Sequence, residues 1–167
     1  AVSPPLSRTL VTSLLSDPAR LQDRARREGY LYFKGLIDPR SILNLRQQIL
    51  QVCLKHGWLD EGSPLGEGIV KKGVSHIESD TPEWRSFYCD ILKHHDFHAL
   101  ALHPSLLGMF EKLFGEGVLP HSRNICRAIF PASETITTPP HQDHFPIGGT
   151  EESWTAWIPI GDCPAEL

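Results

Sequence analysis

The sequence predicts an α+β protein, with helices in the first two thirds and strands in the last third. Up to Gly117, apolar residues recur at helical spacing between proline-marked starts and glycine stops. After Gly117 they alternate, at residues 124–130 and again at 154–160, as in strands that bury one face. Runs of helices followed by runs of strands are typical of the α+β class. We therefore expect a single domain over residues 1–167, mainly helical over 1–117 and carrying strands over 118–167.

Four helix starts share one pattern, a capping side chain followed by proline. They are Asp17-Pro18, Asp38-Pro39, Thr81-Pro82 and His103-Pro104. Proline suits the first helical turn because its φ is already helical and its missing N–H has no partner there. Glycines that can end a helix follow at Gly29, Gly57 and Gly115. The pattern predicts helices over residues 19–28, from 39 to just before 57, from 82 onward and from 104 to near 115.

Three further segments complete the prediction. The aromatic run Tyr30-Leu31-Tyr32-Phe33, ended by Gly35, predicts a short strand. Residues 60–73 are rich in glycine and predict a loop. A short segment at residues 139–145 is also expected to be a strand.

Composition limits the classes of function. The chain has 167 residues, a formal charge of -4 and 40% hydrophobic residues, which is ordinary for a globular protein that needs no disulfide. It shows no basic stripe for nucleic acid and no apolar run that would cross a membrane. The four cysteines are far apart and form no C-x-x-C pair, which favours free thiols in a reducing, cytoplasmic compartment. Nothing in the sequence indicates an oligomeric state.

The sharpest chemical feature is Pro140-His141-Gln142-Asp143. On a strand, residues i and i+2 project from the same face, so His141 and Asp143 could reach one ion together. An imidazole and a carboxylate form two thirds of the facial triad of non-haem iron oxygenases. The alternative is a loop histidine beside an unrelated turn aspartate.

A second H-x-D match, His94-His95-Asp96, lies in a predicted helical region. Residues i and i+2 of a helix point to nearly opposite sides, so this match predicts no metal pair. His94 and His98 have the helical i, i+4 spacing of a metal pair, with an exposed helix face as the alternative.

Two motifs in order resemble the phytanoyl-CoA dioxygenase family. The first is residues 28–39, Glu-Gly-Tyr-Leu-Tyr-Phe-Lys-Gly-Leu-Ile-Asp-Pro, which is similar to the family's opening strand and first long helix. The second is His141-Gln142-Asp143 followed by Trp154-Thr155-Ala156-Trp157-Ile158-Pro159-Ile160-Gly161-Asp162, which resembles its central signature. The resemblance implies helices packed on a double-stranded β-helix, a cupin-like jelly roll that is incomplete in this chain.

The resemblance also implies roles for single residues. His141 and Asp143 match the first two ligands of Fe(II), and Trp157 matches an aromatic position that lines the 2-oxoglutarate pocket, with core packing as its alternative. Arg127 matches a position that contacts cosubstrate or substrate in some relatives, or it lies at a sheet edge. Lys72 matches loosely a basic position that helps hold the cosubstrate, or it is solvated surface charge.

The family has a further metal histidine and an arginine for the distal carboxylate of 2-oxoglutarate, and neither is found after Asp143 on the metal-facing side here. We expect the chain to be part of a longer one, with a complete but inactive homologue as the alternative.

The resulting hypothesis is an Fe(II)- and 2-oxoglutarate-dependent dioxygenase that uses O₂ to hydroxylate a small-molecule or acyl-CoA-type substrate. Asp143 favours hydroxylation, because halogenating relatives lack this carboxylate. The alternatives are a non-catalytic cupin-like binding module and another cupin-type metalloenzyme. No nucleic acid or membrane is expected as a partner.

Overall fold

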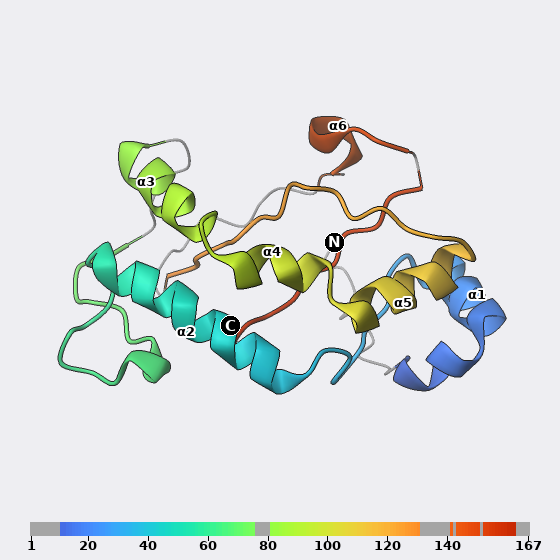
Figure 1. Cartoon of the computed structure of the whole chain (residues 1–167), viewed down its shortest axis with the longest axis horizontal. Coiled ribbons are helices and arrows are strands. Elements are labelled where there is room, and N and C mark those ends of the chain that lie inside the picture. The colour runs from blue at the N-terminus through green and yellow to red at the C-terminus, as the bar shows by residue number, and fades with distance from the viewer. Residues whose placement is uncertain (1–10, 76–80, 131–140, 142, 151, 163–167) are drawn as a thin grey trace, which may run out of the picture. The chain divides into compact units, whose positions relative to one another are not determined.

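The computed structural model is helical (Figure 1). It describes residues 11–75, 81–130, 141, 143–150 and 152–162. Within these residues the only β pairing is a single antiparallel bridge between Leu59 and Val70. None of the described helices combines the length and the apolar character needed to cross a membrane. The chain divides into two compact units, Ala1–Ser41 with His98–His121 and Ile42–Phe97 with Ser122–Leu167. The expectation of a single domain stays a prediction.

The proline-marked helix starts are confirmed. The helices are α1 (Pro18–Glu28), α2 (Pro39–Lys55), α3 (Pro82–Ile91), α4 (His95–Ala101), α5 (Pro104–Phe114) and α6 (His144–Ile147). The side chains of Asp17, Thr81 and His103 accept hydrogen bonds from backbone N–H groups of α1, α3 and α5, which satisfies donors that a helix start leaves free. Gly29 ends α1 with φ 72° and Gly115 ends α5 with φ 78°, a left-handed conformation that favours glycine.

The first unit is built on the contact between α1 and α5, which lie side by side (Figure 1). Leu21 and Ala25 of α1 are buried, as are three residues at helical spacing on α5, Leu106, Met109 and Leu113. Polar contacts join the same elements: the Gln22 amide donates to the carbonyl of Lys112, and Lys112 Nζ donates to the carbonyl of Leu15 in the 3-10 helix Thr12–Ser16.

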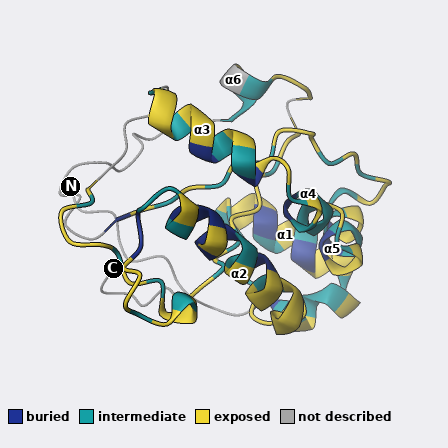
Figure 2. Ribbon diagram, turned by 60° about the vertical axis from the view of Figure 1, so that its left-hand side comes forward, coloured by how far each residue is buried: buried dark blue, intermediate teal, exposed yellow. Residues whose placement is uncertain are grey.

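The second unit is built on α2, α3 and a cluster of aromatic rings. The buried residues of α2, Leu45, Ile49, Leu50, Val52 and Cys53, recur at helical spacing, so this helix buries one side (Figure 2). Trp58, which follows α2, is only 2% exposed. Its ring centroid lies 4.3 Å from that of Phe87 on α3 and 5.4 Å from that of Phe130. The indole N–H donates to Glu83 over 3.0 Å, so the buried ring leaves no polar atom unsatisfied.

Residues 122–130 of the second unit are covered on one side only. Cys126, Ala128 and Phe130 are shielded, whereas Ile125, Arg127 and Ile129 are exposed. The alternation expected from the sequence is therefore present. Burial raises the pKa of the Cys126 thiol to about 11 and that of Cys53 to about 12, so neither is a reactive thiolate near neutral pH.

The predicted β-structure is wrong. In the described parts of residues 118–162 no strand forms, and so the expected double-stranded β-helix is not present. The predicted strand at residues 30–33 is also irregular, although the Val11 N–H donates to the Tyr32 carbonyl. Alternating burial requires only that a segment covers something apolar, while a strand also needs a ladder of hydrogen bonds to a neighbouring backbone. In residues 122–130 the burial of side chains alternates because one side of the segment lies against the aromatic cluster.

One carboxylate, Asp90 near the end of α3, gathers three cationic or ionisable side chains. Lys55 Nζ lies 2.7 Å from its Oδ2, Lys93 Nζ lies 2.8 Å from its Oδ1, and His56 Nε2 lies 3.1 Å from Oδ2. The hydrogen bond from Lys55, followed by those from Lys93 and His56, holds the pKa of Asp90 well below its usual range. Since Lys55 and His56 lie at the end of α2, the carboxylate ties α2 to α3.

We expect Asp90→Asn to lower the urea midpoint of unfolding, and the loss to depend on pH. The folded-state pKa of Asp90 lies below the unfolded value of about 3.9, so its contribution to the free energy of unfolding is present above that pH and is lost on acidification. The difference between wild type and variant should therefore be largest near pH 7 and should shrink below about pH 4. Denaturation curves from pH 7 to pH 3 measure it, and a difference that is the same at every pH contradicts the account.

Candidate metal site

His141 and Asp143 lie close together, although not on the strand that the sequence predicts. The Nε2 atom of His141 lies 3.3 Å from Oδ1 of Asp143. The side chains are 47% and 33% exposed, so one side of the pair faces solvent. The two groups lie where the chain enters α6, the short helix near the end of the chain (Figure 1).

The backbone that produces this approach is a turn, and the expected strand at residues 139–145 is not formed in its described part. Asp143 has φ -64° and ψ -22°, and its carbonyl accepts a hydrogen bond from the Ile147 N–H over 3.0 Å. Asp143 is thus the residue from which α6 starts, and its side chain turns back toward His141. Residues 139, 140 and 142 lie outside the described part of the chain.

The separation of the two donor atoms suits a shared metal ion. Two donors that bind one ion at about 2.1 Å in adjacent tetrahedral or octahedral positions lie about 3.0 to 3.4 Å apart. Imidazole nitrogen with carboxylate oxygen is also a donor set that transition metals of intermediate softness accept. The residues present therefore fit two positions of a metal site. No group of three or more His, Cys, Asp or Glu side chains suited to a metal occurs among the residues that the structure describes.

A third side chain acts on the carboxylate from a distant part of the sequence. Thr155 Oγ1 donates a hydrogen bond of 2.5 Å to Oδ2 of Asp143. Oδ1 is left for His141. The sequence predicted only that Thr155 shares one face of its strand with Trp157. No spacing in the sequence indicates a contact between Thr155 and Asp143.

The segment that carries Thr155 presents one side to solvent. Thr155, Trp157 and Pro159 are exposed, and Trp154 and Ile158 are half-buried, as alternation predicts, although Ala156 is exposed as well. Trp157 is 71% exposed, so within the described residues its ring packs little. Its role at a 2-oxoglutarate pocket stays a prediction.

The other two predicted cosubstrate residues are also on the surface. Arg127 is exposed between Ile125 and Ile129, and its charge, with that of Arg123, opposes the upward shift that burial gives the pKa of Tyr88. Lys72 is exposed in a turn of the loop at residues 60–73. The described contacts do not join either residue to His141 or Asp143, and both assignments stay predictions.

The second H-x-D match serves the fold. Oδ2 of Asp96 accepts hydrogen bonds from Gln48 over 2.6 Å and from Asn44 over 2.8 Å, both on α2. The bond from Gln48, then that from His95, lowers the pKa of Asp96. His94 precedes α4 instead of lying in it, so His94 and His98 do not share one helix. Oδ1 of Asp96 also lies 3.3 Å from Nδ1 of the adjacent His95, so the two matches differ in the other oxygen, which two amides of α2 occupy in Asp96 and the Thr155 hydroxyl occupies in Asp143.

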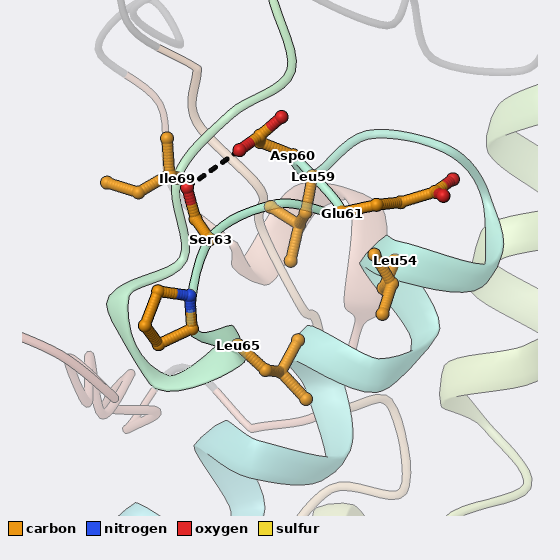
Figure 3. A pocket seen from close by; sticks show the side chains of 8 residues that line it. Leu54, Leu59, Asp60, Glu61, Ser63, Leu65 and Ile69 are labelled. Carbon is orange, nitrogen blue, oxygen red and sulfur yellow. Dashed lines mark hydrogen bonds between the residues drawn. The ribbon is translucent and has the colours of Figure 1, made fainter.

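A small hollow beside the end of α2 is unrelated to these residues (Figure 3). It encloses about 30 Å³ and is lined by Leu54, Leu59, Asp60, Glu61, Ser63, Pro64, Leu65 and Ile69. Ser63 Oγ donates to Asp60 Oδ2 over 2.7 Å across its rim. Such a volume holds about one water molecule, while ligand pockets are roughly ten times larger. This hollow is therefore not a substrate site.

Comparison with known proteins gives two informative relatives. The chain is 31% identical over 153 residues to the 1-deoxypentalenic acid 11-beta-hydroxylase of Streptomyces arenae, and the aligned part covers 89% of this chain and 50% of that protein. It is also 31% identical over 155 residues to the protein of the same name from Streptomyces exfoliatus, with the same coverage. The chain is a distant homologue of these hydroxylases. It spans about half the length of the curated relatives it matches.

No protein-family profile matches the chain, and no solved structure matches it. The resemblance to the phytanoyl-CoA dioxygenase family stays a prediction for this reason.

We expect Trp157→Ala to leave the free energy of unfolding within about 0.5 kcal/mol of wild type, because the side chain is largely exposed. The matched comparison is Trp58→Ala, which removes a buried ring from the aromatic cluster and should cost about 3–5 kcal/mol. Chemical denaturation followed by circular dichroism measures both. A large loss for Trp157→Ala would show that this indole is a core residue, against the pocket assignment.

Proposed function

We propose that the chain contributes to an Fe(II)- and 2-oxoglutarate-dependent oxygenase that hydroxylates a small molecule, with His141 and Asp143 as two of the iron ligands. The observation that carries the proposal is the 3.3 Å approach of His141 Nε2 to Asp143 Oδ1 in the motif that resembles the family's metal signature. The homology to two proteins named as hydroxylases supports the reaction type. The whole protein's third ligand would come from a histidine beyond the described residues.

The two side chains have distinct tasks in this proposal. His141 offers a neutral nitrogen and Asp143 an anionic oxygen from one short turn, so an ion bound there keeps a net positive charge that attracts an anionic cosubstrate. Their partial exposure leaves the remaining coordination positions open on the solvent side. Iron with 2-oxoglutarate and O₂ would supply the oxidation that places a hydroxyl on a C–H bond, while 2-oxoglutarate becomes succinate and CO₂.

Three exposed residues are the candidates for recognising the cosubstrate. Trp157 would cover one side of 2-oxoglutarate, and its exposure leaves the indole face accessible for such a contact. Arg127 and Lys72 are candidate cations for its carboxylates. A carboxylate at Asp143, in place of a small residue, favours hydroxylation over halogenation.

Metal binding and cosubstrate turnover test the proposal together. The full-length protein, purified without metal, should bind one equivalent of Fe(II) under anaerobic conditions and should release succinate when 2-oxoglutarate and O₂ are added. His141→Ala and Asp143→Ala should each weaken Fe(II) binding at least about 10-fold and abolish succinate release, since each removes a ligand. Dialysis with iron analysis and an assay of succinate measure the two effects.

The matched control is Asp96→Ala, which alters the other H-x-D match. It removes the acceptor of Gln48 and Asn44, so it should lower the melting temperature while leaving Fe(II) affinity unchanged. Full Fe(II) binding by Asp143→Ala, or loss of binding in Asp96→Ala at a temperature where that variant is folded, would contradict the assignment.

A further inference from the structure

The two oxygens of the Asp143 carboxylate have different partners. Oδ2 accepts the hydroxyl of Thr155 at 2.5 Å, and Oδ1 faces Nε2 of His141 at 3.3 Å. A hydroxyl bound to an ionised carboxylate typically lies 2.5–2.7 Å away, so the first contact has the length of a strong charge-assisted bond. One oxygen of the carboxylate is therefore bonded to Thr155, and the other lies on the side of His141.

We propose that Thr155 is a positioning residue that holds Asp143 as a one-oxygen ligand, with Oδ1 beside His141 Nε2 and Oδ2 withheld from the metal. The inference rests on the proposed function. It adds that Oδ1 is the carboxylate oxygen that binds the ion and that Thr155 fixes this arrangement.

The need for such a partner follows from the freedom of an aspartate. Rotation about its last torsion is broad and nearly two-fold, so an unassisted carboxylate can exchange its oxygens or offer both to one ion. The hydroxyl of Thr155 removes this freedom by fixing Oδ2. Side chains that bond to a metal ligand in this way commonly raise metal affinity about 10- to 100-fold.

Thr155 can act in this way because its own position is restricted. Threonine is branched at Cβ, which limits rotation about χ1. At its far end the same segment passes close to the Arg46 side chain of α2. A Cβ added at Gly161 would come 2.5 Å from Arg46 Nη1, and Nη2 of the same arginine donates to the carbonyl of Gly66 over 3.2 Å.

A structural tie is the alternative role of the same bond, in which Thr155 only attaches its segment to Asp143 at the start of α6. The two roles predict different effects when Thr155 is replaced by a side chain without a hydroxyl. A structural tie would affect the melting temperature, whereas a positioning residue affects the affinity and the coordination of a bound ion.

The experiment titrates the metal-free full-length protein with Co(II), a spectroscopic substitute for Fe(II), and follows visible absorption. Thr155→Val removes the hydroxyl and keeps the branched shape. It should weaken Co(II) binding about 10-fold, at the lower end of the range because Thr155 is exposed, and should change the absorption bands as the carboxylate binds through both oxygens. Thr155→Ser restores the hydroxyl and should return affinity to within about 2-fold of wild type.

Thr150→Val is the matched control, since Thr150 is another exposed threonine whose hydroxyl is directed to the carbonyl of Glu152. It should bind Co(II) as wild type does. Wild-type affinity and an unchanged spectrum in Thr155→Val would overturn the inference alone. A fall in affinity that Thr155→Ser does not restore would overturn it as well, and a wild-type chain that binds no Co(II) would remove the proposed function together with the inference.

Discussion

The burial of Trp58 is the constraint on which the second unit depends. Its indole packs on Phe87, meets Phe130 edge-on and donates to Glu83, so one side chain joins the end of α2, helix α3 and residues 122–130. The Tyr88 hydroxyl adds a second attachment, since it donates to the Asn124 carbonyl over 2.8 Å. These contacts decide which side of residues 122–130 is covered, and therefore which side faces outward with Arg127. Large aromatic side chains suit this purpose because each buries much apolar area and still satisfies its polar atom.

The candidate metal site, in contrast to the aromatic cluster, does not depend on buried side chains. Its two donors are partly exposed, lie in one turn and owe their arrangement to the start of α6 and to a single long-range hydrogen bond from Thr155. Core packing contributes little to it, so substitutions at the site and in the aromatic cluster should have separable consequences. This separation suits a metal site, because the side that admits ligands must remain open while the protein holds the donor atoms. It also explains why Asp96, which bonds to amides of α2, belongs to the fold and not to the site.

Local signals in the sequence were sufficient for the helices that start at a proline and insufficient for the rest, including α6, where a strand was predicted. Asp17-Pro18, Thr81-Pro82 and His103-Pro104 predicted helix starts because capping is decided within a few residues. The strands were wrong because alternation reports one-sided burial, whereas a ladder depends on a partner elsewhere in the chain. The spacing of His141 and Asp143 predicted their proximity, yet the predicted strand geometry was replaced by a turn. Thr155 had no local signal, since its contact with Asp143 spans 12 residues of irregular chain.

We propose that one iron ion lies between His141 Nε2 and Asp143 Oδ1. A crystal structure of the iron-loaded full chain, with anomalous scattering recorded at the iron absorption edge, tests it directly. The account predicts an anomalous peak about 2.1 Å from both atoms, with Oδ2 still bonded to the Thr155 hydroxyl. An iron peak bound by other residues, or by only one of these two, would contradict it.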